Sequence, residues 1–126
     1  MSMQDIVSDF VSRVNNSIMI KRAEVVVLKS KFVSEISKKL VKLGYFLSFE
    51  EDGKYYLKVT LNLAKLAKVK RVSKPGQRTY ASSEDYLPIA NGFGYNLLTT
   101  SKGVLSHVEC KKLKVGGEVV MQVITK

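Results

Sequence analysis

The spacing of apolar residues changes from one segment to the next along the first part of the chain. Positions 3–14 carry apolar side chains every three to four residues, which predicts an amphipathic helix that stops at Asn15-Asn16. A second helix is predicted between Ser30, a favourable capping residue, and Gly44, which can adopt the positive φ of a helix end. Its inward face is predicted to carry Val33, Ile36, Leu40 and Leu43.

Short runs of β-branched and aromatic residues predict strands between and after these helices. Residues 23–28 form the first run, and residues 45–50 and 55–61 flank Asp52-Gly53, a dipeptide favoured in tight hairpin turns. Within the last run polar residues alternate with apolar ones, so one face is expected to be buried. The residues assigned to that face are Tyr55, Leu57, Val59 and Leu61.

The second half of the chain is predicted to be mainly β. Residues 68–73 and 78–82 are expected to pair with each other around Pro75-Gly76, a turn dipeptide. Further strands are predicted at residues 95–100 and 118–124, with a short helix at 106–112.

These patterns predict an α+β fold in two parts. Residues 1–64 form an N-terminal α-β-α-β-β part, and residues 65–126 form a mainly β C-terminal part. Without a long linker, the two parts are expected to pack as one body. A chain of 126 residues is long enough to bury a core of its own.

Positive charge is concentrated in the middle of the sequence. Between Gly53 and Ser83 there are eight basic residues and no Asp or Glu, so this segment supplies most of the net charge of +10. Such a concentration attracts polyanions, of which RNA is the commonest in the cytosol, although a solvated surface that aids solubility is the alternative. The eight residues are Lys54, Lys58, Lys65, Lys68, Lys70, Arg71, Lys74 and Arg78.

The sequence carries no recognisable apparatus for catalysis. His107 and Cys110 are the only histidine and cysteine, too few for a zinc site, and neither a nucleophile elbow nor a phosphate-binding loop is present. We therefore expect no enzyme activity, no cofactor, no metal and no small-molecule substrate. The lone cysteine and the lack of a long apolar run predict a cytoplasmic protein with no membrane partner.

Two glycine-containing turns carry the groups best suited to RNA. The segment 99–103 reads Thr-Thr-Ser-Lys-Gly and places hydroxyls, a cation and a flexible residue at a strand end. Hydroxyls both donate and accept, so they suit 2′-OH groups and phosphates, and glycine permits close approach of a backbone. Gly116-Gly117-Glu118 offers a second tight turn. On their chemistry alone, both segments are also compatible with ordinary turns.

Three separated blocks resemble one known family. The stretch 94–105, followed by Val-Gly-Gly-Glu-Val at 115–119, resembles the C-terminal signature of the eighth protein family of the small ribosomal subunit, in its bacterial-type form. Residues 71–80 resemble the central hairpin of that family. Asp5, Asp9, Arg13 and Asn16 resemble its opening helix.

This resemblance implies a structural constituent of the small ribosomal subunit that binds small-subunit rRNA directly and helps assemble its central domain. The implied partners are that rRNA and neighbouring small-subunit proteins, on a cytoplasmic or an organellar ribosome. A free regulatory protein that represses translation of a messenger RNA is the alternative.

The resemblance also implies which residues contact RNA. Thr100, Ser101, Lys102 and Gly103 form the core contact, and Gly116, Gly117 and Glu118 form the neighbouring turn. Thr99, just before the core contact, is also assigned to RNA binding. The implied backbone or stacking contacts are Arg71, Lys74, Arg78 and Tyr80. Arg13 and Asn16 are assigned to a second RNA segment or to closing the N-terminal part.

Overall fold

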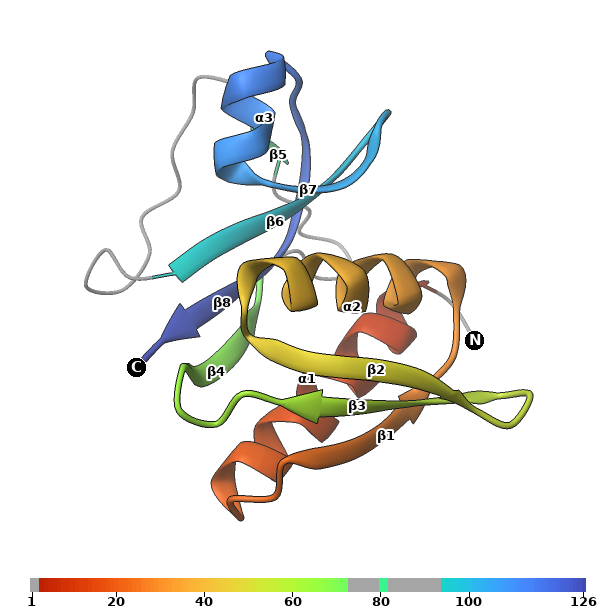
Figure 1. Cartoon of the computed structure of the whole chain (residues 1–126). Helices are drawn as coiled ribbons and strands as arrows, with labels where there is room; N and C mark the ends of the chain where they lie inside the picture. The colour runs from red at the N-terminus through yellow and green to blue at the C-terminus, as the bar shows by residue number, and fades with distance from the viewer. Residues whose placement is uncertain (1–2, 73–79, 82–93) are drawn as a thin grey trace.

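The computed structural model describes residues 3–72, 80–81 and 94–126, and it confirms the α+β prediction (Figure 1). In chain order the described elements are α1 (Met3–Met19), β1 (Glu24–Leu28), α2 (Lys31–Leu43), β2 (Phe46–Asp52), β3 (Tyr56–Leu61), β4 (Leu66–Arg71), β5 (Tyr80–Ala81), β6 (Gly94–Thr100), β7 (Gly103–Ser106), α3 (His107–Leu113) and β8 (Gly117–Thr125).

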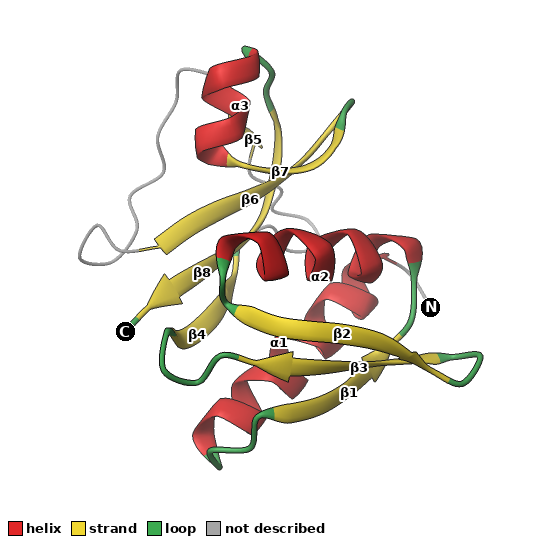
Figure 2. Cartoon of the chain, viewed as in Figure 1, coloured by secondary structure: helices red, strands yellow, loops and turns green. Residues whose placement is uncertain are grey.

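A three-stranded antiparallel sheet, in the order β1-β3-β2, packs against α1 and α2 (Figure 2). The buried face of β3 carries Leu57, Val59 and Leu61, as the alternation predicts. The prediction is wrong for Tyr55, which is 65% exposed. This residue precedes β3 beside the β2–β3 turn, at the end of the hairpin that extends beyond α2 (Figure 1). The Nζ of Lys54 lies 5.6 Å from its ring centroid.

Both predicted ends of α2 are confirmed. The Ser30 hydroxyl accepts a hydrogen bond from the Val33 backbone N–H at 3.0 Å, and Gly44 ends the helix with a φ of 89°. Lys65 stabilises the same helix end, because its Nζ donates to the Leu43 carbonyl at 2.6 Å. One of the eight central basic residues therefore has a structural role.

The predicted end of the first helix is wrong, because α1 continues past Asn15-Asn16 to Met19. The side-chain amide of Asn15 donates to the Val69 carbonyl at 2.7 Å, and its oxygen accepts from the Val69 N–H at 2.9 Å. With its polar groups bonded to β4, this side chain does not compete for the helical backbone. Asn15 thus joins α1 to the second sheet.

The second sheet has the order β4-β8-β6-β7, with β5 also paired to β8. The predicted pairing of residues 68–73 with 78–82 is wrong, because β4 and β5 each pair with β8 instead. The long, mostly buried β8 offers one continuous ladder to both strands. Residues 73–79 lie outside the described part. The short strand β7, which the sequence did not predict, forms a hairpin with β6.

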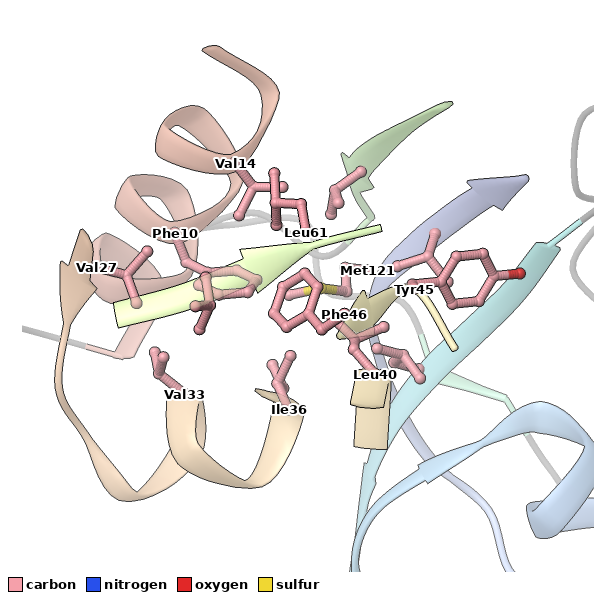
Figure 3. Close-up of a cluster of buried hydrophobic side chains, with 14 of the residues drawn as sticks. Phe10, Val14, Val27, Val33, Ile36, Leu40, Tyr45, Phe46, Leu61 and Met121 are labelled. Carbon is pink, nitrogen blue, oxygen red and sulfur yellow. The ribbon is translucent and has the colours of Figure 1, made fainter. Parts of the chain in front are cut away.

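One apolar cluster connects the two sheets. Figure 3 shows Met121 of β8 among side chains of the N-terminal part, including Phe46. At the edge of this cluster the hydroxyls of Tyr45 and Thr125 share a hydrogen bond of 2.6 Å. The predicted division at residues 64 and 65 lies in the connection between β3 and β4, and it stays a prediction.

An ion pair also ties α2 to α3. The Nζ of Lys39 lies 2.7 Å and 2.9 Å from the two carboxylate oxygens of Glu109, and the Lys39 side chain is only 11% exposed. Burial would raise the pKa of the Glu109 carboxyl, but the hydrogen bond and charge of Lys39, with hydrogen bonds from Ser106, together lower it. The ion pair with Lys39 therefore favours the ionised form of Glu109.

We expect Glu109→Gln to lower the free energy of unfolding by about 0.5–1 kcal/mol near pH 7, a modest effect because the carboxylate is partly exposed. Gln retains the capping-box geometry with Ser106, so the change isolates the charge. A carboxyl with a lowered folded-state pKa stabilises the fold above its unfolded-state pKa, and that stabilisation is lost as pH falls through the folded-state value. Urea unfolding from pH 7 to about pH 3 should show the difference between the two proteins disappearing; a constant difference would contradict the ion-pair role.

Candidate nucleic-acid interface

The strand register brings predicted site residues from three parts of the sequence to one region of the second sheet. Tyr80 of β5 pairs with Glu118 of β8, Glu118 pairs with Thr99 of β6, and Thr99 pairs with Val104 of β7. Tyr80 is 66% exposed at this position, so its ring is available for stacking. Tyr80 therefore lies beside the turn at residues 116–118, and β8 and β6 separate it from β7.

Thr100 and Gly103 close the β6–β7 hairpin, and Ser101 and Lys102 form its two-residue turn. The Thr100 hydroxyl donates to the Gly103 carbonyl at 2.9 Å and accepts from the Lys102 N–H at 3.1 Å. Gly103 has a φ of 100°, a conformation that favours glycine. Two internal hydrogen bonds and the positive φ of Gly103 therefore define the shape of the turn.

The three hydroxyls of this segment differ in their availability. The Thr99 hydroxyl is buried and has no hydrogen-bond partner among the described residues, and the Thr100 hydroxyl is bonded within the turn. Ser101 is exposed, and no hydrogen bond within the described part of the chain occupies its hydroxyl. Of the three, Ser101 is the one whose hydroxyl is ready to bond a ligand. Lys102 is exposed beside it.

Gly117 holds the second turn against the hairpin. A Cβ atom on this residue would lie 2.1 Å from the Thr99 carbonyl oxygen, a distance at which the backbone has to move. The missing side chain therefore lets β8 approach β6 where both strands reach the turns. Gly116 is exposed and Glu118 is half-buried in the same region.

A small apolar cluster packs at the base of the β6–β7 hairpin. It contains Leu98, Leu105, Cys110 and Val119, and α3 begins directly after β7 with a capping box at Ser106. Because β6, β7, β8 and α3 all contribute to this cluster, the strands that carry the turn are packed against their neighbours. Such packing lowers the conformational-entropy cost of binding a ligand at the turn.

His107 and Cys110 take part in the packing and hydrogen bonding of the second sheet. The Nδ1 of His107 accepts a hydrogen bond from the Asn96 N–H at 3.0 Å, and burial lowers the pKa of this imidazole. Burial likewise raises the pKa of the Cys110 thiol. In the ranges that the structure describes, no three His, Cys, Asp or Glu side chains lie close enough to hold a metal ion.

The remaining predicted site residues lie elsewhere. Arg13 and Asn16 line a separate hollow of about 510 Å³ between α1 and β1. There Arg13 forms an ion pair with Asp9 at 2.9 Å and donates a hydrogen bond to the Val26 carbonyl at 3.1 Å. Arg71 lies on β4 opposite Met121. Lys74 and Arg78 fall outside the described residues.

Two lysines that the sequence did not single out also lie near the hairpin. Lys38 and Lys42 of α2 line a hollow together with Lys102. Their spacing of four residues placed them on one helix face, but only the tertiary structure shows that this face adjoins the turn.

Comparisons with known proteins agree with the resemblance seen in the sequence. The family model described as ribosomal protein S8 matches residues 5–124. A small ribosomal subunit protein uS8 of Bartonella henselae is 35% identical over 98% of this chain and 99% of its own length. The uS8 protein of Caulobacter sp. strain K31 is 37% identical with the same coverage, and protein uS8c of Euglena gracilis is 35% identical over 94% of this chain and 96% of its own.

Among the described residues, no helix combines the length and the apolar character needed to cross a bilayer.

Proposed function

We propose that this chain, which belongs to the ribosomal protein S8 family, is a constituent of the small ribosomal subunit that binds small-subunit rRNA directly and helps assemble its central domain. The observation that supports this best is the β6–β7 turn, where Ser101 and Lys102 are exposed on a fixed hairpin beside Gly117. The proposed role is structural rather than catalytic. Neighbouring small-subunit proteins are the proposed protein partners.

The chemistry of the turn suits A-form RNA. The deep groove of such a helix hides its base edges, whereas its shallow groove displays 2′-hydroxyls that a protein hydroxyl can bond. Ser101 would supply that hydroxyl, Lys102 would neutralise a nearby phosphate, and the absence of a side chain on Gly103 would let the RNA backbone approach. Tyr80 would stack on an unpaired base at the edge of the same contact.

The two residues next to this hydroxyl have a different role in the proposal. Thr100 shapes the turn through its internal hydrogen bonds, and the enclosed hydroxyl of Thr99 faces away from solvent. We therefore assign these two threonines to positioning Ser101, and Gly116, Gly117 and Glu118 to the adjoining turn.

Basic residues would supply affinity without reading sequence. Lys68 and Lys70 are exposed on β4, in the second sheet that also carries the turn. Phosphate contacts from such residues position a protein on RNA but carry no sequence information. Arg71, Lys74 and Arg78 are proposed for the same role, and Arg13 and Asn16 for a contact with a second RNA segment.

A free regulator that represses translation of a messenger RNA is the second candidate, because the same turn would bind a message that mimics the rRNA site. Sedimentation of a cell extract separates the two roles. A ribosomal protein travels with small subunits at near-unit stoichiometry, and a regulator stays mostly free. The proposal places the protein on a cytoplasmic ribosome, and the relative from Euglena gracilis makes an organellar ribosome the alternative.

We expect Ser101→Ala to weaken binding of the cognate rRNA hairpin by about 1–3 kcal/mol, because an RNA group would lose its partner in a dehydrated contact. The fold should be unchanged, since Ser101 is exposed and makes no bond within the described chain. Titration of the variant with the cognate hairpin and with a generic duplex at equal salt measures the effect.

Ser48→Ala is the matched control, because Ser48 is an exposed serine on β2 in the other sheet. This control should bind both RNAs like the wild-type protein. If Ser101→Ala also binds the cognate hairpin like wild type, the hairpin is an ordinary turn and the proposed site is wrong.

A further inference from the structure

A basic groove lies between α2 and the β6–β7 hairpin. The hollow measures about 470 Å³, and the charged residues that line it are Glu35, Lys38, Lys39, Lys42 and Lys102. We refer to it as the lysine groove. It adjoins the proposed RNA-binding turn, yet most of its charge comes from the N-terminal part of the chain.

Three of the four lysines in the groove are available to a ligand. Lys39 also lines the groove, but its Nζ forms an ion pair with Glu109 at 2.7 Å, so its charge is already neutralised. Lys38, Lys42 and Lys102 are exposed, and none of them takes part in an ion pair within the described ranges. The groove therefore presents more positive charge than its single carboxylate, Glu35, can offset.

The groove is continuous with the turn. Lys102 belongs to the two-residue turn and also lines the groove. Gly103, which follows the turn, lines the groove as well. Val104 and Leu105 also line the hollow, and both residues are buried. Mobile ammonium groups around a hollow suit a flexible, multiply charged chain such as a sugar–phosphate backbone.

We propose that the lysine groove binds the sugar–phosphate backbone of the RNA strand that continues from the contact at Ser101. This inference rests on the proposed function, which it extends from the hairpin turn to α2. Lys38 and Lys42 lie one helical turn apart on α2, so they contact two phosphates of the same strand. The groove adds affinity but no sequence preference, because phosphates are common to every RNA.

The test compares two pairs of lysine-to-glutamine changes. In Lys38→Gln/Lys42→Gln the groove loses two charges, and in the control Lys21→Gln/Lys31→Gln two exposed lysines outside the groove are changed. Binding to an RNA fragment that spans the central domain of small-subunit rRNA is measured across a salt series, with thermal melts to confirm that each variant folds. The groove variant should lose roughly 1.4–1.8 units of logarithmic salt slope, which is about a 25- to 60-fold loss of affinity near 0.1 M salt. Its ratio of affinities for rRNA and for a generic duplex should stay unchanged.

Lysine acetylation followed by mass spectrometry gives a second readout on the wild-type protein. Bound rRNA should protect Lys38 and Lys42, whereas Lys21 and Lys31 should remain reactive. The proposal is overturned if the two double variants bind equally well, or if Lys38 and Lys42 are protected only in the assembled subunit, which would indicate a neighbouring protein. Failure of the proposed function looks different, because wild-type protein would then bind the generic duplex as tightly as rRNA.

Discussion

Replacing Ile36 with Ala is expected to lower the free energy of unfolding by about 2–5 kcal/mol. Ile36 is fully buried on the inner face of α2, within the core that also holds Phe10 and Phe46 (Figure 3). Truncation removes buried methyl groups and leaves a cavity that the packed surroundings fill only in part. Urea unfolding followed by circular dichroism measures the change.

Leu47→Ala provides the matched control, because Leu47 is 61% exposed on β2 and loses the same kind of side chain. Its effect should stay within about 0.5 kcal/mol. A similarly small loss for Ile36→Ala would show that the inner face of α2 has been assigned to the wrong residues.

The second large effect is expected at Gly117. Gly117→Ala places a Cβ atom 2.1 Å from the Thr99 carbonyl oxygen, so the pairing of β8 with β6 has to shift. We expect a loss of about 3 kcal/mol in the free energy of unfolding, since overpacking against backbone is hard to relieve. The same shift should weaken binding of the cognate rRNA hairpin, because both turns move apart.

Gly103→Ala separates this steric effect from a conformational one. No atom lies within 4 Å of a Cβ built on Gly103, but its φ of 100° is unfavourable for alanine. The expected cost is therefore only about 1–2 kcal/mol. Equal stability of Gly117→Ala and the wild-type protein would mean that β8 and β6 are not in contact at Thr99.

The sequence predicted those elements whose signals are local. Ser30 and Gly44 mark both ends of α2 through bonds to their immediate neighbours, and the structure confirms both. The end of α1 was wrong because the partner of Asn15 is Val69, far along the chain. Likewise, nothing local to β4 or β5 shows that each pairs with β8.

The candidate site also has features that the sequence shows and features that only the tertiary structure shows. The motif at residues 99–103 was visible in the sequence, but which of its hydroxyls is available depends on packing and on the bonds of Thr100. The strand β7 was missed because its four residues run directly into the cap of α3. Lys38 and Lys42 belong to a face of α2 whose neighbour is set only by the tertiary fold.

The most direct test of the proposed function is a chemical footprint of the purified chain on naked small-subunit rRNA. The account predicts protection of one irregular hairpin in the central domain at near-equimolar protein, without any other ribosomal protein, and weaker protection with Ser101→Ala. Uniform protection along the rRNA, or none before other proteins are added, would contradict direct and specific binding by this chain.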